Sequence, residues 1–163
     1  MQVDDRGESI DYQAMAEFRY QIRRFLHFSE ETAKSAGIEP QQYQLLLALK
    51  GLPTGRKATI RELAERLQVQ HHSTVELIDR LEERGLVRRR RDEQDQRQVL
   101  LSLTTEGEAM LKQLALRHRT ELRQVAPALV MALRALDDAH EGIEKPEAAG
   151  LQSNEEGNSD TER

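Results

Sequence analysis

One stretch of the chain, residues 59–104, constrains the fold more than any other. Two short segments with apolar residues at helical spacing lie on either side of a turn at Gln68–Gln70. Two strand-like runs follow, LVRRRR at 86–91 and QVLLSLT at 98–104, separated by the polar segment DEQDQR. Such runs around a polar loop predict an antiparallel β-hairpin with an exposed tip. We therefore expect a helix, a tight turn, a second helix and a hairpin.

Long helices are expected on both sides of this stretch. Apolar residues recur at helical spacing over about 10–36 and again over about 105–141, where Pro127 is expected to interrupt the pattern and start a last helix. Thr104 is expected to cap the second of these regions. The predicted fold class is mainly α with a small β-hairpin, in one domain spanning 10–141 whose helix-turn-helix and hairpin occupy about 38–104. Residues 1–9 are expected to form a disordered lead and the acidic segment 142–163 a disordered tail.

The composition limits the core and suggests a partner. Hydrophobic residues make up 37% of the chain and aromatic residues only 4%, so the core must be aliphatic and modest. A small core divided over long helices often needs a second chain to complete its burial. We therefore expect a partner chain to cover the apolar faces of the two long helical regions.

Several classes of protein are disfavoured by what the sequence does not contain. The 163 residues include no cysteine, which excludes disulfides, thiol redox switches and cysteine zinc sites. The first residues lack an apolar run, and no stretch approaches the length of a membrane span. We expect a cytoplasmic protein that does not associate with membranes.

The net charge of −5 is unevenly distributed. Residues 142–163 contain six acidic and two basic residues and so account for −4 of the total. In contrast, residues 88–91 are four consecutive arginines, and Arg97 follows in the loop. Because local charge matters more than the sum, the hairpin is a candidate nucleic-acid contact in an otherwise acidic chain.

The second helix of a helix-turn-helix lies in the DNA major groove. If its apolar residues pack inward, the side chains that point elsewhere are candidates for DNA contact. Ser73 and Thr74 also lie near the helix start, where free N–H groups hold phosphates. The alternative is that these are only solvated polar residues, and the hairpin that follows favours contact. The candidates are His72, Ser73, Thr74, Glu76 and Arg80.

The hairpin adds a second group of candidates. A guanidinium on a thin hairpin suits the narrow, electronegative minor groove, which is the role expected of Arg97. Phosphates would repel Asp95, so we expect it to support the hairpin loop. Strand side chains alternate, so either 88 and 90 or 89 and 91 face the DNA backbone. We take Arg89 and Arg91 as candidates; the alternative is a surface hairpin with ordinary ion pairs.

The same stretch resembles the MarR family of bacterial regulators. The motifs are ELAERLQV, STVELIDRLEERGLVRR and DEQDQRQVLLSLTTEG, within 59–107, while the resemblance in organisation covers about 10–140. It implies a homodimeric repressor that binds palindromic operator DNA. It also implies release of DNA by a small, often phenolic or lipophilic ligand in a cleft, for which Arg23, His27 and Tyr43 are candidates. Gln68 stands where many relatives have glycine.

Other functions receive less support. We find no phosphate-binding loop, nucleophile motif or compact carboxylate pair, so we expect neither an enzyme nor a cofactor. His72 and Glu76 are spaced for shared metal ligation, but without a third ligand nearby we expect no metal site. The main alternative to DNA binding is a protein-interaction module built on the same scaffold. Protonation of the histidines at 71 and 72 is a further hypothesis for regulating DNA affinity.

Overall fold

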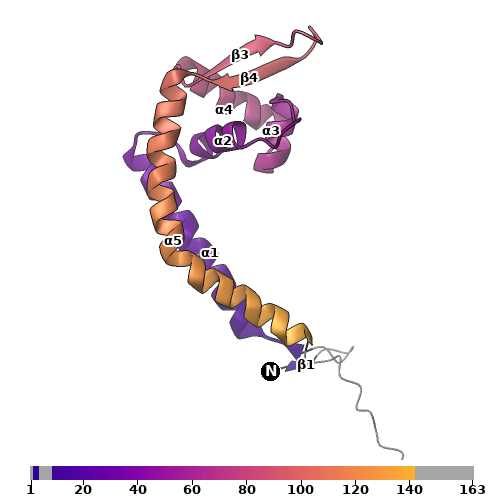
Figure 1. Ribbon diagram of the computed structural model, residues 1–163, viewed down its shortest axis with the longest axis vertical. Coiled ribbons are helices and arrows are strands. Elements are labelled where there is room, and N and C mark those ends of the chain that lie inside the picture. The colour runs from indigo at the N-terminus through magenta and orange to yellow at the C-terminus, as the bar shows by residue number, and fades with distance from the viewer. Residues whose placement is uncertain (1, 4–8, 142–163) are drawn as a thin grey trace, which may run out of the picture.

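The computed structural model consists of a compact head carried on two long helices (Figure 1). It describes the backbone of residues 2–3 and 9–141 and the side chains of residues 11–137. The elements, in chain order, are β1 (Gln2–Val3), β2 (Ser9–Ile10), α1 (Tyr12–Ser35), α2 (Pro40–Lys50), α3 (Ile60–Leu67), α4 (His71–Glu83), β3 (Val87–Arg91), β4 (Val99–Leu103) and α5 (Thr105–Glu141). The expected mainly helical fold with one β-hairpin in the head is therefore confirmed.

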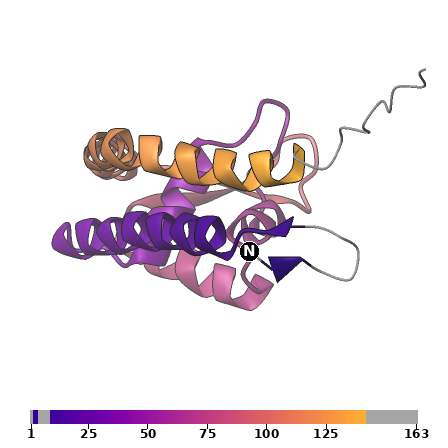
Figure 2. The same ribbon diagram turned by 90° about the horizontal axis from the view of Figure 1, so that it is seen from below.

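We call α1 and α5 the stalk, and α2, α3, α4, β3 and β4 the head. The two stalk helices run side by side along the molecule (Figures 1 and 2). In the head, β3 pairs antiparallel with β4, in a register that sets Arg89 opposite Leu101. Among the described residues, none of the helices is long and apolar enough to cross a membrane.

The core lies in the head and extends into the top of the stalk. It is mostly aliphatic, as the composition predicts, and includes the ring of Tyr43. Side chains from α2, α3 and α4 meet there with 0% exposure. These side chains are Leu45, Leu46, Leu63, Ile78 and Leu81. Full burial of an aliphatic side chain contributes roughly 1.5–3 kcal/mol, so this cluster fixes how α3 and α4 sit against α2.

The junction between head and stalk depends on a close backbone contact at the start of α5. The Thr104 hydroxyl accepts from the Gly107 N–H at 3.0 Å and donates to the Gly85 carbonyl at 2.6 Å, so Thr104 caps α5 as expected. A Cβ atom on Gly107 would lie 2.0 Å from the carbonyl oxygen of Leu86. Only glycine allows α5 to begin this close to the head.

Two details differ from the expectation drawn from the sequence. Pro127 does not start a new helix: α5 continues through it to Glu141, so that prediction was wrong. A proline lacks one hydrogen-bond donor, and a long helix packed on a neighbour tolerates that loss as a bend. The lead was expected to be disordered over 1–9, but Gln2–Val3 forms a strand that pairs with Ser9–Ile10. Residues 4–8 and the expected tail, 142–163, lie outside the described residues.

Candidate nucleic-acid interface

The turn before α4 keeps a backbone shape that glycine usually provides. Gln68 ends α3 with φ at 53°, in the left-handed region, and its side-chain amide donates to the Glu65 carbonyl at 2.7 Å. The local hydrogen bond helps a non-glycine residue to hold this conformation. The turn therefore retains the geometry that directs α4 away from α3.

Helix α4 presents a polar face away from the core. His72, Glu76 and Arg80 are exposed, and Ser73 is half-buried. The residue before the helix, Gln70, makes no side-chain capping bond, so the N–H groups of the first turn lack a side-chain cap. A helix start of this kind attracts anions through its free donors and its dipole.

Thr74 requires a correction. Its side chain has 0% exposure, and its hydroxyl donates to the Gln70 carbonyl at 3.1 Å. A side chain sealed into the core beside the turn cannot reach a nucleic acid. We therefore remove Thr74 from the candidate contacts and assign it to the packing of the helix-turn-helix.

Alternation along β3 separates the four arginines into two pairs. Val87 is buried at the start of the strand, so Arg89 lies on the side that faces α4, while Arg88 and Arg90 lie on the other side and are exposed. The Arg89 guanidinium donates to the carboxylates of Asp79 and Glu82. Burial lowers the pKa of Arg89, but the hydrogen bonds to Asp79 and Glu82 outweigh it and raise the pKa overall.

The hairpin loop is held by a carboxylate. Asp95 accepts from the backbone N–H of Arg97 at 3.0 Å and from the side-chain amide of Gln98 at 3.1 Å. The guanidinium of Arg91 donates to the Gln96 carbonyl at 3.1 Å, which closes the loop from the strand side. The Arg97 side chain is therefore exposed on a loop whose backbone is held by hydrogen bonds to the side chains of Asp95 and Arg91.

Sequence reasoning missed Asp92, which anchors the base of the loop. Its side chain is buried, and its carboxylate accepts from Lys57 Nζ at 2.5 Å and from the Gln94 N–H at 3.0 Å. The hydrogen bond from Lys57 and then that from Gln94 lower the pKa of Asp92. Lys57 and Asp92 are 35 residues apart in the sequence, so no local motif signals their contact.

The three candidate ligand contacts do not form one site. Arg23 and His27 are exposed on α1, whereas Tyr43 is only 3% exposed and its ring stacks on His118 with centroids 4.4 Å apart. Burial raises the pKa of Tyr43. Tyr43 is therefore part of the core, and its proposed role in an open cleft is withdrawn.

His118, which sequence reasoning also missed, joins the stalk to the head. It is buried on α5, with Nδ1 at 2.7 Å from the Leu114 carbonyl and Nε2 at 2.8 Å from the Ser29 hydroxyl of α1. Its ring also meets the edges of Phe25 and Phe28. One imidazole thus contacts α1 and α2 from α5.

No metal site was expected from the sequence. In the part of the chain that the structure describes, no three His, Asp or Glu side chains group closely enough to hold an ion.

The order and packing of these elements define a winged helix-turn-helix, in which α4 holds the position of the recognition helix and the β3–β4 hairpin that of the wing. A sequence model of the MarR family matches residues 36–98. The resemblance to that family, which the motifs of α4 and the wing predicted, is therefore confirmed over this segment.

Curated relatives carry the same segment. The organic hydroperoxide resistance transcriptional regulator of Bacillus subtilis is 37% identical over 73 residues, which are 45% of this chain and 49% of the relative. The transcriptional repressor MdtR of the same organism is 33% identical over 78 residues, 48% of each protein. The chain thus matches about half the length of each of these relatives.

Solved structures extend the likeness to the stalk. AbsC, a MarR family transcriptional regulator from Streptomyces coelicolor, aligns with a TM-score of 0.64 and 23% identity over 88% of this chain and 95% of its own. A mutant of S. aureus MepR bound to an oligodeoxyribonucleotide aligns with a TM-score of 0.57 and 19% identity over 82% and 95%. At this level of identity the likeness shows a shared fold.

Proposed function

We propose that this protein is a sequence-specific DNA-binding transcriptional regulator. Helix α4 enters the major groove with His72, Ser73, Glu76 and Arg80 toward the bases and phosphates, and the wing places Arg97 in the adjacent minor groove. The observation that carries the proposal is the Arg97 loop, whose backbone is fixed by Asp95 while the guanidinium stays exposed. A fixed loop loses little conformational entropy when it binds.

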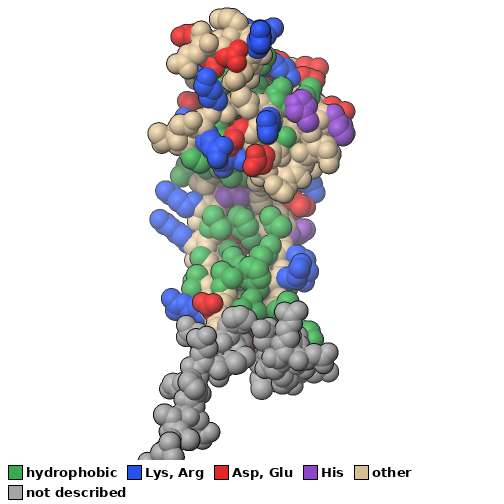
Figure 3. All heavy atoms as spheres, turned by 90° about the vertical axis from the view of Figure 1, so that its right-hand side faces the viewer, with side chains coloured by type: hydrophobic (Ala, Val, Ile, Leu, Met, Phe, Trp, Pro, Cys, Tyr) green, Lys and Arg blue, Asp and Glu red, His purple; other side chains and the backbone are tan. Residues whose placement is uncertain are grey.

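Local charge supports this proposal despite the acidic total. Arg90 and Arg97 are exposed, and among the described residues neither forms an ion pair with a carboxylate. Figure 3 shows Lys and Arg side chains distributed over the head. Side chains with free charge can replace the counterions of DNA, whereas a guanidinium already paired within the protein, such as Arg89, contributes less.

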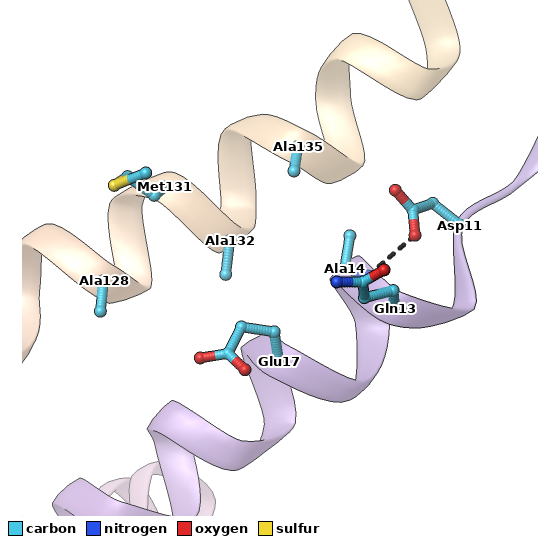
Figure 4. Close-up of a pocket in the computed structure, with 8 residues that line it drawn as sticks. All are labelled: Asp11, Gln13, Ala14, Glu17, Ala128, Met131, Ala132 and Ala135. Atoms are coloured by element: carbon cyan, nitrogen blue, oxygen red, sulfur yellow. Dashed lines mark hydrogen bonds between the residues drawn. The ribbon is translucent and has the colours of Figure 1, made fainter.

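We propose that the stalk forms a homodimer. Large apolar side chains of α1 and α5 remain exposed, with Met131 at 72% and Tyr12 at 57%, and Figure 3 shows an apolar strip along the stalk. Near its lower end, a hollow of about 450 Å³ lies between α1 and α5. Alanine side chains line it, and Asp11 and Glu17 stand at its edge (Figure 4). A second copy that packs here would remove this apolar surface from water.

Two finer parts of the proposal rest on likeness. We propose repression of neighbouring genes from a palindromic operator, since one matched relative is named a repressor and a two-fold dimer fits a two-fold site. Release by a small lipophilic or phenolic effector is proposed with Arg23 and His27 as contacts. The sequence contains no cysteine, so a thiol-based response to hydroperoxides is not available to it. The cytoplasmic location remains part of this proposal.

The decisive experiment is binding to the intergenic DNA beside the protein's own gene, measured by fluorescence anisotropy over a series of salt concentrations. Regulation through DNA predicts tight binding. The logarithm of the association constant should fall steeply and linearly with the logarithm of the salt concentration, because counterions are released. A scrambled duplex of equal length is the control. Absence of binding at low salt to this duplex and to genomic fragments would instead favour a protein-interaction module.

A further inference from the structure

The geometry points to Arg89 as a positioning residue that fixes the wing relative to the recognition helix, and not as a DNA contact. This inference rests on the proposed DNA-binding function and gives one of the arginines in β3 a different task. It follows from three hydrogen bonds that join β3 to α4, from the face of the strand on which Arg89 lies, and from the charges that it neutralises.

Three hydrogen bonds connect Arg89 to the recognition helix. Its Nη2 donates to Asp79 Oδ1 at 2.5 Å, and its Nη1 donates to Glu82 Oε2. Its backbone N–H donates to the other oxygen of the same Glu82 carboxylate at 3.1 Å. The planar guanidinium fork holds two carboxylates at once, and Glu82 holds the strand through both backbone and side chain. We call this arrangement the Arg89 clip.

The strand register directs this side chain away from DNA. Arg89 lies opposite Leu101, which is buried, and two residues after Val87, which is also buried. Its side chain is 26% exposed, the lowest value among the arginines that form ion pairs. Arg88 and Arg90, on the other side of β3, are exposed. The alternation of side chains along β3 therefore places Arg89 in the clip. It leaves Arg88 and Arg90 on the outer face, where they are available to phosphates.

The clip also removes an electrostatic obstacle. Asp79 and Glu82 are three residues apart and share one side of α4, and their side chains remain 52% and 40% exposed. Carboxylates on a helix that enters the major groove repel phosphates. Because Arg89 draws both of them toward the wing, it neutralises them while it fixes the angle between the two DNA-contacting elements. Loss of Arg89 should therefore weaken DNA binding without removing any contact to DNA.

A double-mutant cycle tests this role, using a duplex enriched by the wild-type protein from a randomised pool. We expect Arg89→Ala to weaken binding by about 10-fold, within the range of couplings found inside one ion-pair network. In the Asp79→Asn/Glu82→Gln background, the same substitution should have almost no further effect, because the partners through which it acts are gone. Arg89→Lys should restore binding only in part, since one ammonium does not reproduce the fork.

Arg90→Ala is the matched control, because it removes an arginine of the same strand that forms no ion pair among the described residues. As a phosphate contact, Arg90 should lower the slope of log Kd against log salt by about one when it is removed, equally in both backgrounds. An Arg89→Ala variant that behaves in this way would be a direct DNA contact, and the inference would be overturned. Unchanged affinity in Arg89→Ala would overturn it as well.

A measurement without DNA separates this inference from the proposed function. Since the chain has no cysteine, spin labels can be placed through Gln96→Cys in the wing and Glu83→Cys on α4. The distance distribution between the labels should be narrow with Arg89 present and broad in Arg89→Ala. An equally narrow distribution in the variant refutes the clip even if DNA binds. Failure of the wild-type protein to enrich any duplex refutes the proposed function, and with it the positioning role.

Discussion

Replacement of Gly107 by alanine should destabilise the protein, although alanine is the better helix former. A Cβ at this position would lie 2.0 Å from the carbonyl oxygen of Leu86, 3.0 Å from its carbonyl carbon and 3.3 Å from its Cα. These are backbone atoms, so no change of rotamer relieves the overlap. The start of α5 and the residue before β3 must separate by about 1.4 Å to bring the 2.0 Å approach to ordinary contact at 3.4 Å.

The magnitude follows from three opposing effects. Overpacking of a rigid site costs roughly 1–3 kcal/mol and occasionally more. The separation also strains the hydrogen bond from the Thr104 N–H to the Leu86 carbonyl, now 3.1 Å, which contributes about 1 kcal/mol. The gain in helix propensity from glycine to alanine offsets about 1 kcal/mol. We therefore expect the free energy of unfolding to fall by about 1–3 kcal/mol, a decrease in Tm of roughly 2–12 °C for a chain of this size.

Urea unfolding, followed by circular dichroism at one fixed protein concentration, measures this change without interference from mass action in a dimer. Ala109→Gly is the matched control, because residue 109 is exposed in the same helix and should lose only about 1 kcal/mol through propensity. Alanine should thus be preferred at 109 and glycine required at 107. A Gly107→Ala variant as stable as the wild type would refute the reasoning from the Leu86 contact.

Three further predictions concern the wing and the stalk. Arg97→Ala should weaken DNA binding by roughly 1–3 kcal/mol while sedimentation shows an intact dimer, and unchanged affinity would mean that the wing is misassigned. Met131→Glu should shift sedimentation toward the monomer, because it places a charge in the proposed apolar interface. Gln41→Glu, which adds the same single charge at an exposed position of the head, is the control. Because the pKa of Asp92 is lowered, its pairing with Lys57 stabilises the wing above the ordinary aspartate pKa of about 4 and is lost as the pH falls through the lowered value. Asp92→Asn should therefore flatten the acid side of the stability profile, and a profile of wild-type shape would contradict that role.

The elements of the head could be predicted from the sequence because their signals are local. Helical periodicity located α3 and α4, and the polar loop between two apolar runs located the wing. The same local signals did not predict on which of two faces a side chain lies, or whether packing carries a helix past a proline. Thr74 stands at the helix start, where an exposed contact was plausible, but the turn rotates it into the core. Pro127 indicated a helix end, but packing against α1 carries α5 through it.

The roles of individual charged residues could be predicted less well, because they depend on contacts between distant parts of the chain. The alternation of β3 showed that its arginines divide into pairs, yet it could not show which pair faces α4. The packing of Val87 and Leu101 into the core sets that face, and only the packed hairpin brings the carboxylates of Asp79 and Glu82 within reach of Arg89. Asp92 and His118 find their partners across 35 and 89 residues of sequence, and no pattern within the sequence connects them.

The proline inside α5 has a mechanical consequence. Pro127 cannot donate to the carbonyl four residues earlier, at Arg123, so one rung of the helix is missing below the point where His118 fastens α5 to α1 and α2. Figure 1 shows that α5 curves along its length. Bending α5 at Pro127 therefore strains one hydrogen bond fewer than bending the helix at any other position. If the stalk forms the proposed dimer, Pro127 lies between the head and the interface, at the point where α5 bends with the smallest loss of hydrogen bonding.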